Sequence, residues 1–259
     1  MSLPPATVAA LYRHPVKGLS PEPLETVELL EGAYFPNDRL YAVENGPSGF
    51  DPQAPAHHPK TAFLMLMRDA RLAALASRYD AASTTLTLSL EGHEVVKAEL
   101  STAGGRAQVE DFLTFYMGEE ARGPLKLLAA PDGFRFTDSR RSGFLSLLNL
   151  ESVRALGQRM GAELDPLRFR MNLHLSGWPE GSELELAGRT LAVGEARIHI
   201  LKRTERCAAV NVNPATAVRD INVVKGLVKA LGHTDCGIYA KVVRSGRVAI
   251  GDPIAVLPA

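Results

Sequence analysis

The sequence predicts a mainly β protein with flanking helices, an α+β chain, and two observations lead to this expectation. Short alternating segments follow one another from residue 182 to residue 202, separated by Gly188 and Gly194 at the spacing of strands in a β-barrel or sandwich. A few other stretches repeat apolar residues at helical intervals, which indicates amphipathic helices packed against sheets. These expected helices cover residues 68–78, 108–117, 149–160 and 222–231.

Length and composition indicate a globular protein of one large domain or two modest ones. The chain has 259 residues, of which 46% are hydrophobic and 22% charged, and its formal net charge is zero. This is enough chain to bury an apolar core without disulfides, and no excess of charge favours nucleic acid or an anionic membrane. We divide the chain into an N-terminal unit, residues 1–120, and a second unit, residues 121–259.

No part of the sequence is expected to enter a membrane. Its apolar runs are all well short of the roughly 20 residues of a membrane-spanning helix, and its start, Met-Ser-Leu-Pro-Pro, lacks the basic and apolar regions of a signal peptide. Two cysteines, Cys207 and Cys236, are too few for a secreted disulfide framework. These features favour a cytoplasmic protein, in which a bridge between the two cysteines is not expected.

The N-terminal unit is expected to consist mainly of strands. Lys17 lies in a loop rich in proline and glycine after the first strand, and Arg39 opens the third strand. A lysine in such a loop is ordinarily a solvated surface residue. The expected strands are 7–14, 24–30, 40–43 and a hairpin of 84–90 with 94–100, accompanied by helices at 68–78 and 108–117.

The second unit begins with a strand at 125–130 and a polar loop at 136–144. This loop contains Asp138, two arginines and three hydroxyl groups. Arginine side chains match the oxygens of phosphate or another oxyanion in pairs, although the same composition is typical of an ordinary exposed turn. The loop is therefore a candidate anion-binding segment.

A helix and a strand with one polar face follow this loop. Asn149 is expected to cap the helix, which ends at Gly161. In the next strand Arg170, Asn172 and His174 alternate with apolar residues and so share one face. That face either points outward or lines a site, and His174 is most simply a surface or inter-strand histidine.

Cys207 is the residue on which our interpretation of the chemistry depends. It follows the alternating segment 196–202, and Arg203 and Arg206 lie close to it in the sequence. Nearby cations favour the thiolate, which is the form that acts as a nucleophile or as a soft metal ligand. The alternative is a small buried hydrophobic residue, a common role for a free cysteine.

Short motifs occur in a characteristic order along the chain. The second unit contains Arg206-Cys207, Asn213-Pro-Ala-Thr216, Gly237-Ile-Tyr239 and Gly246-Arg-Val-Ala-Ile-Gly-Asp252-Pro, and the first contains Leu11-Tyr-Arg-His-Pro-Val-Lys17-Gly and Asn37-Asp-Arg39-Leu-Tyr-Ala-Val43. Together they resemble the MOSC family, named after the C-terminal domain of molybdenum cofactor sulfurase, and in particular the amidoxime-reducing component proteins. The resemblance implies a MOSC β-barrel preceded by a smaller, β-rich N-terminal barrel domain.

The same resemblance implies a molybdenum cofactor site between the two units. Cys207 would be the catalytic residue and would supply a thiolate ligand to molybdenum, because thiolates suit soft, redox-active metals. Cationic side chains would neutralise the phosphate and oxo groups of the cofactor. The implied cofactor-binding residues are Lys17, Arg39, Asp138, Arg170, Asn172 and Arg206.

The activity implied by the resemblance is the reduction of small N-hydroxylated compounds such as amidoximes and hydroxylamines. The alternative is a non-catalytic carrier of the molybdenum cofactor, or of sulfur as a persulfide on Cys207. Zinc-dependent hydrolysis is a third reading, based on His233-Thr-Asp-Cys236, but one short pair does not make a zinc site. Pyridoxal phosphate is not expected, because the chain lacks the desulfurase domain to which a MOSC domain is fused in the sulfurase.

A reductase also needs a source of electrons. The sequence has no dinucleotide-binding fingerprint, and two cysteines are too few for a conventional iron–sulfur cluster. A separate electron-transfer protein is therefore expected as a partner.

Overall fold

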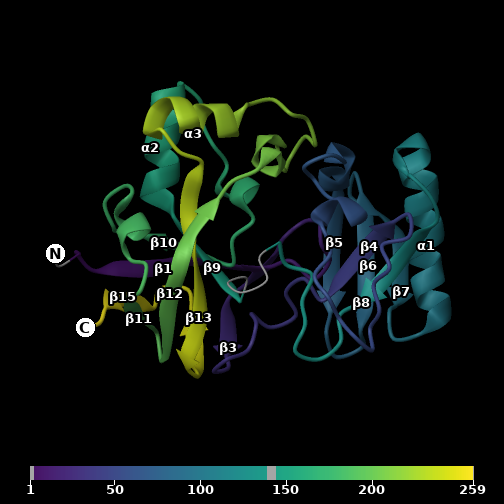
Figure 1. Cartoon of the computed structure of the whole chain (residues 1–259), viewed down its shortest axis with the longest axis horizontal. Coiled ribbons are helices and arrows are strands. Elements are labelled where there is room, and N and C mark those ends of the chain that lie inside the picture. Colours follow the sequence, from purple (N-terminus) through teal and green to yellow (C-terminus); the bar gives the residue numbers. More distant parts are fainter. Residues whose placement is uncertain (1–2, 139–143, 259) are drawn as a thin grey trace.

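The computed structural model describes residues 3–138 and 144–258 and contains two β-rich lobes (Figure 1). One lobe, called the barrel lobe, holds both chain ends, and the other, called the second lobe, carries helix α1 on its outer side. Strands dominate both lobes and helices flank them, which confirms the expected mainly β, α+β class.

The barrel lobe is built around a closed sheet. Within the described residues, seven strands follow one another around it and the last pairs again with the first. All neighbours are antiparallel except β9 and β10, and β2 (Glu22–Leu24) extends the sheet from β1. In order around the barrel the strands are β1 (Ala6–Arg13), β10 (Leu173–Ser176), β9 (Leu145–Asn149), β13 (Asp235–Arg244), β12 (Ala196–Glu205), β11 (Thr190–Val193) and β15 (Pro253–Val256).

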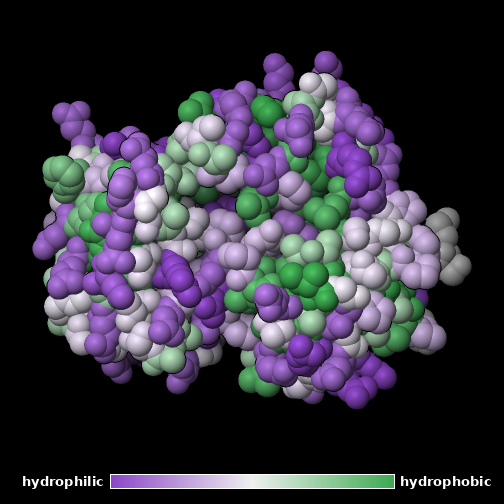
Figure 2. Space-filling model, turned by 180° about the vertical axis from the view of Figure 1, so that it is seen from behind, coloured by the Kyte–Doolittle hydropathy of each residue, from purple (hydrophilic) through white to green (hydrophobic). Residues whose placement is uncertain are grey.

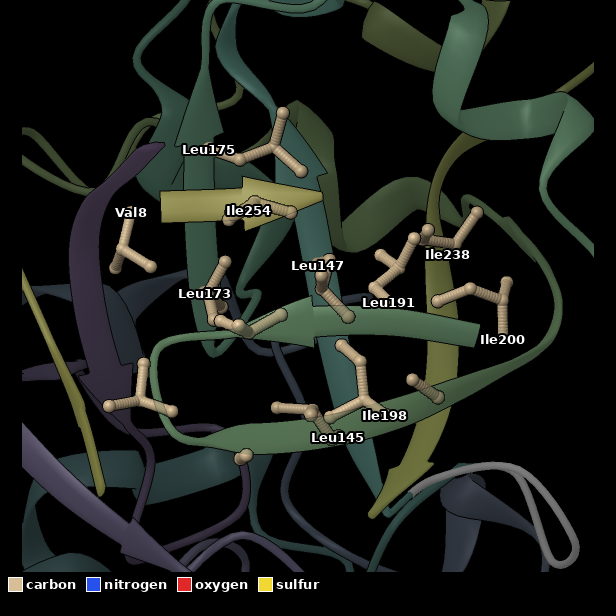
Figure 3. Packing of buried hydrophobic residues seen from close by; sticks show 14 of the residues in the cluster. Val8, Leu145, Leu147, Leu173, Leu175, Leu191, Ile198, Ile200, Ile238 and Ile254 are labelled. Carbon is tan, nitrogen blue, oxygen red and sulfur yellow. The ribbon is translucent and has the colours of Figure 1, made fainter. Parts of the chain in front are cut away.

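The interior of the barrel is filled by branched apolar side chains. Figure 3 shows side chains such as Leu147, Leu173, Ile198 and Ile238 converging from different strands, and each of these four is completely buried. Alternate residues of a strand point to opposite faces, so the alternating segments place one apolar set inside the barrel. Closure of the sheet also leaves no open edge in the ring of strands.

The second lobe contains two small sheets and one long helix. Helix α1 packs against β7 and β8, and the lobe has its own apolar cluster, which includes Leu72, Leu86 and Leu113. The elements are β4 (Tyr41–Asn45) paired with β8 (Leu125–Ala129), the sheet of β5 (Leu75–Asp80), β6 (Thr85–Leu90) and β7 (His93–Glu99), and α1 (Ala103–Met117).

Segments from the two ends of the sequence combine in the barrel lobe. Strand β1 completes the barrel, and β3 (Thr26–Leu29) pairs with β14 (Gly246–Ala249). Conversely, Val212, which follows β12 in the sequence, packs in the apolar cluster of the second lobe. The chain therefore crosses between the lobes more than once, and these crossings place distant segments beside each other.

Local signals placed several elements correctly. Helix α2 (Leu150–Met160) begins at Asn149, whose Oδ1 accepts a hydrogen bond from the Glu151 amide at 3.1 Å, and ends at Gly161 with a left-handed φ of 65°. Helix α3 (Val223–Leu231) and the hairpin of β6 and β7 are likewise confirmed. Helix caps and tight turns depend on neighbouring residues, so they can be predicted from the sequence.

Two expectations for local structure were wrong. The stretch 68–78 is not one amphipathic helix but a short 3-10 turn, Ala70–Ala74, followed by strand β5, because pairing with β6 satisfies the backbone of residues 75–80. The strand expected from residue 170 starts only at Leu173, after the 3-10 turn Pro166–Phe169. The remaining 3-10 turns cover Lys60–Ala62, Gly118–Glu120, Ser182–Glu185 and Ala208–Asn211.

One face of the molecule carries no dominant chemical character. Figure 2 shows hydrophilic and hydrophobic residues mixed over the face seen from behind, in keeping with the zero net charge. Among the residues that the structure describes, no helix has the length and apolar character needed to cross a membrane.

Candidate functional site

One cavity, with a volume of about 290 Å³, brings together every residue proposed from the sequence as part of a site. These residues come from both sequence units and from loops at the ends of strands. They are Lys17, Arg39, Asp138, Arg170, Asn172, Arg206 and Cys207. We call this space the cationic cavity.

Cys207 lies where β12 ends and the 3-10 turn Ala208–Asn211 begins. Its side chain is half-buried and its thiol is free. Cys236 is also free but is buried in a separate apolar cluster, and burial raises the pKa of its thiol to about 12. The two cysteines are therefore chemically distinct, and Cys207 is the one at the cavity.

Two cations of the cavity are paired with carboxylates. Lys17 forms an ion pair with Asp138 and donates to the carbonyl oxygen of Phe136 at 3.0 Å. Arg39 donates to Asp38 at 2.5 Å. These contacts differ from the solvated surface position that is ordinary for a loop lysine.

Asp38 is buried and remains ionised. Burial alone would raise its pKa, but the Arg39 guanidinium and the neighbouring His14, whose ring Nδ1 lies 3.6 Å from Oδ1, outweigh burial and lower the pKa to about 2. The backbone amide of His14 also donates to Asp38 at 2.7 Å. Burial lowers the pKa of His14 well below its ordinary value, so the imidazole is neutral at pH 7.

Two other cations of the cavity have no carboxylate partner. The Arg170 guanidinium has no hydrogen-bond or ion-pair partner within residues 3–138 and 144–258. Arg206 donates to the Phe169 carbonyl and contacts the Met171 sulfur at 3.7 Å, while its Nε is buried without a partner in the described part of the chain. Burial and the nearby Arg39 lower the pKa of Arg170 to about 9, so an anion in the cavity would stabilise its charged form.

The backbone orients Arg170 through an unusual conformation. Its φ is 54°, in the left-handed region, and its carbonyl accepts a hydrogen bond from Arg39 Nη2 at 2.9 Å. A non-glycine residue in that region is uncommon and is held by its surroundings. The paired arginine thus fixes the turn that carries the unpaired one.

Asn172 lines the cavity but is also a structural brace. Its Oδ1 accepts hydrogen bonds from the amide and hydroxyl of Ser146, at 3.2 and 2.8 Å, and its Nδ2 donates to the carbonyl of Tyr12 at 3.2 Å. It therefore ties β9 to β1, and one hydrogen of Nδ2 is left for a further contact. His174 is an inter-strand residue whose ring contacts that of Tyr12 at an interplanar angle of 52°, with centroids 5.0 Å apart, and it is buried rather than on the surface.

Sequence reasoning missed several residues of the cavity wall. Lys202 and Thr204, near the end of β12, line the cavity together with Arg206, which directly follows the strand, and the three residues occupy alternate positions in the sequence. This period of two was the signal that could have revealed them. It also corrects the expected role of Arg203, which pairs with Glu185 at 2.5 Å outside the cavity. Lys60 gave no comparable signal, and Tyr239 belongs to the motif Gly237-Ile-Tyr239, which indicated the family but not a role in the cavity.

Part of the candidate anion-binding loop lies outside the described residues, and the zinc reading finds no support. The arginines and serines of loop 136–144 lie at 139–143, outside the described residues. Among the residues described, no group of three or more His, Cys, Asp or Glu side chains is placed to hold a metal ion. His233 accepts a hydrogen bond from the Asp235 amide at 3.1 Å, a local turn contact.

The fold and the cavity define a class of protein: two β-rich lobes, with a free thiol at the end of a barrel strand and, in the same cavity, arginines that have no carboxylate partner among the described residues. Comparison with protein families identifies residues 5–122 as a MOSC N-terminal beta barrel domain and residues 139–255 as a MOSC domain. The chain therefore belongs to the MOSC family, in its form with an N-terminal barrel domain. This family is associated with molybdenum cofactor binding and sulfur-related roles.

Solved structures include similar proteins of low sequence identity. The YuaD protein of Bacillus subtilis is 15% identical, with 98% of this chain and 97% of that chain covered and a TM-score of 0.48. YiiM of Geobacillus stearothermophilus is 16% identical, with 44% of this chain and 54% of that chain covered and a TM-score of 0.34. For YiiM of Escherichia coli the identity is 20%, the coverage 45% and 55%, and the TM-score 0.35. A comparison with curated protein sequences finds no match.

Proposed function

We propose that this chain binds the molybdenum cofactor in the cationic cavity and reduces N-hydroxylated compounds, with the Cys207 thiolate as the protein ligand of molybdenum. One observation carries the proposal: the half-buried free thiol and two arginines that contact no carboxylate in the described part of the chain line the same cavity. A thiol supplies a soft donor, and unpaired arginines supply positive charge for an anion.

The residues of the cavity fit such a group. The cofactor combines an anionic phosphate with a soft metal, so it needs cations and a thiolate in one space. Arg170 lacks any partner among the described side chains, and the buried Nε of Arg206 lacks an acceptor. Burial, followed by repulsion from Arg39, lowers the pKa of Arg170, and a bound anion would oppose both effects by stabilising the charged guanidinium.

When bound, the cofactor would supply the two-electron chemistry, and the residues of the chain would position it and the substrate. Cys207 would hold the metal, while Arg170 and Arg206 would neutralise negative charge. Tyr239 lines the same cavity, and burial raises the pKa of its hydroxyl. Tyr239 is therefore protonated at pH 7 and can donate a hydrogen bond to an oxygen in the cavity.

Electrons would come from a separate protein. The chain has two cysteines, of which Cys236 is buried in an apolar cluster. Since the sequence also lacks a dinucleotide-binding fingerprint, we propose a separate flavin, haem or iron–sulfur protein as the donor.

The same substitution at each cysteine tests the proposal. Protein produced in a host that makes the molybdenum cofactor is analysed for molybdenum and for reduction of benzamidoxime by reduced viologen. Cys207→Ala is expected to lose turnover by at least about a hundredfold, because the metal loses its protein ligand. The matched control, Cys236→Ala, keeps turnover within about twofold.

The outcomes separate the possible functions. Equal molybdenum content and equal turnover in Cys207→Ala and wild type would remove Cys207 from the site. Full molybdenum loading without turnover, whatever the electron donor, would favour the alternative of a cofactor carrier. A persulfide on Cys207 in protein without molybdenum would favour sulfur carriage.

A further inference from the structure

Arg219 connects two wall segments of the cationic cavity from outside the cavity. One segment is the turn at residues 65–69 of the second lobe, part of which lines the cavity. The other is the 3-10 turn Ala208–Asn211 of the barrel lobe, which directly follows Cys207. Arg219 is not a wall residue. It is exposed in the loop between β12 and α3, which reaches towards the second lobe (Figure 1).

The Arg219 guanidinium donates hydrogen bonds to both segments at once. Its Nη2 donates to the carbonyl oxygens of Leu66, Met67 and Arg68 at 3.1, 3.1 and 3.0 Å. Its Nη1 donates to the carbonyl oxygen of Ala208 at 3.3 Å. Within residues 3–138 and 144–258, no other hydrogen bond joins the two segments. Because the guanidinium is planar and rigid, it fixes the spacing between the carbonyl groups that it bridges.

The turn at residues 65–69 is held in shape by its own hydrogen bonds. The carbonyl oxygen of Met65 accepts from the amides of Arg68 and Asp69 at 3.0 and 2.8 Å. The buried carboxylate of Asp69 accepts from the Met65 amide at 2.8 Å, which closes the turn from the other side. A helical turn leaves its last carbonyl groups without amide partners, and a cationic side chain can satisfy them. Arg219 takes this position.

The backbone that carries Arg219 is anchored in the barrel lobe. The next residue, Asp220, accepts two hydrogen bonds from the buried Arg168, at 2.7 and 2.8 Å. Asn213 Nδ2 also donates to Asp220 at 2.7 Å. Just before Arg219, Ala217 has a left-handed φ of 56°, which its surroundings must hold. Arg219 therefore extends from a fixed base in one lobe to a fixed turn in the other.

The backbone around Cys207 depends on these contacts on one side only. Before Cys207, the amide of the preceding residue is hydrogen-bonded within the barrel lobe at 2.9 Å. After it, the Cys207 carbonyl accepts from the Val210 amide at 3.1 Å, closing the turn whose first carbonyl, that of Ala208, Arg219 binds. Val212 packs in the second lobe, but apolar packing has no direction. The hydrogen bonds of Arg219 supply the direction.

We propose that Arg219 is a positioning residue: it holds the backbone that follows Cys207 against the turn at residues 65–69 and so sets how the thiol is presented to the cavity. Its consequence for the cofactor rests on the proposed function, since the same contacts would hold the thiolate ligand in place relative to the opposite wall. Loss of these contacts releases the turn Ala208–Asn211, while the apolar packing of Val212 keeps the lobes together.

The test measures thiol reactivity in protein without cofactor. Iodoacetamide alkylates Cys207 and Cys236 at rates that peptide mass spectrometry resolves, and the buried Cys236 reports general unfolding. Arg219→Met removes all four hydrogen bonds and keeps a side chain of similar reach. The matched control is Arg154→Met, because Arg154 is exposed on α2 and pairs with Glu151 of the same helix.

The expected result is a change confined to Cys207. Arg219→Met raises the alkylation rate of Cys207 about fivefold or more, because the released turn opens more often, and leaves Cys236 within about twofold of wild type. Arg154→Met matches wild type at both cysteines. Arg219→Lys behaves like Arg219→Met at Cys207, because a single ammonium nitrogen cannot bridge the two segments. An unchanged Cys207 rate in Arg219→Met, an equal rise at both cysteines, or full rescue in Arg219→Lys would overturn the proposal.

Measurements on cofactor-loaded protein separate this positioning role from the proposed function. Arg219→Met is expected to lower kcat for benzamidoxime about tenfold and to leave KM within about twofold, because the thiolate is misplaced while the substrate still binds. Equal kcat in Arg219→Met and wild type would overturn the role of Arg219 towards the metal ligand.

Failure of the proposed function gives a different pattern. If loaded wild type turns over no N-hydroxylated compound while Cys207 alone becomes more reactive in Arg219→Met, the reductase function is wrong and the positioning role stands. If wild type turns over and the Cys207 rate is the same in both proteins, the positioning role is wrong and the reductase function stands.

Discussion

The two sides of the cationic cavity differ in how their cations are balanced. On one side Lys17 and Arg39 are each paired with a carboxylate, Asp138 and Asp38. On the barrel side Arg170 and Arg206 contact no carboxylate of the described chain. A paired cation contributes mainly to local structure, because its charge is already neutralised, whereas an unpaired cation keeps its field available for a ligand.

This difference shows that one set of residues holds the cavity wall in position and another set supplies positive charge for a ligand. Asp38 and Arg39 form a buried pair that also holds the carbonyl of Arg170 in its left-handed turn. Arg170 then presents a guanidinium without a carboxylate partner among the described residues to the cavity that Cys207 also lines. The comparison predicts that substitutions on the paired side reduce stability, while substitutions on the unpaired side reduce ligand binding.

Arg39→Met is expected to give the largest loss of stability, about 3 kcal/mol in the free energy of unfolding, because it leaves the carboxylate of Asp38 buried without its partner. Denaturant unfolding measures the change. The double variant Asp38→Asn with Arg39→Met should recover part of the loss, since it removes the uncompensated charge. Equal stability of Arg39→Met and wild type would show that the pair is not structural.

Arg170→Met is expected to show the opposite behaviour. The midpoint of thermal unfolding of this variant stays level or rises, because the repulsion between Arg170 and Arg39 is removed. Its affinity for the cofactor falls by about 1.5–3 kcal/mol, which is a factor of about ten or more. Molybdenum and pterin content after dialysis measures the affinity. Arg203→Met is the matched control, because Arg203 is paired with Glu185 outside the cavity. Full retention of cofactor by Arg170→Met would contradict the proposed role of the unpaired side.

The buried pair also predicts a pH dependence of stability. Asp38 has a folded-state pKa of about 2, below the ordinary 3.8, so its ionisation contributes stability that is complete above pH 4 and is lost as the pH falls towards 2. The contribution amounts to about 2 kcal/mol. Unfolding free energies of wild type and Asp38→Asn, measured across this range, should converge at the acid end. Parallel curves for the two proteins would show that Asp38 does not titrate with a lowered pKa.

Lys17→Met is expected to have the smallest effect on stability, below about 1 kcal/mol, because the side chain of its partner Asp138 is 48% exposed. Solvent can take over the hydrogen bonds of that carboxylate. The measurement is the thermal unfolding of Lys17→Met compared with that of Arg39→Met. A loss as large as that of Arg39→Met would mean that both pairs on this side are structural to the same degree.

The sequence alone determined the features that depend on neighbouring residues. Asn149 and Gly161 mark the ends of α2, and the turn at Glu91-Gly92 joins β6 to β7, because caps and tight turns need only local chemistry. The motifs around Cys207 were sufficient to indicate the family. The seven candidate residues could be named in the same way, and the structure brings all of them to one cavity, although their roles stay predictions.

Only the tertiary structure decided the features that depend on distant segments. Residues 75–80 became strand β5 because β6 pairs with them, against their helical pattern. Lys17 meets Asp138 across 121 positions of sequence, and no local signal distinguishes this paired lysine from the unpaired Arg170. Burial and ion pairing in the cationic cavity bring together residues distant in sequence, and such contacts are set by how the chain packs rather than by the order of its residues.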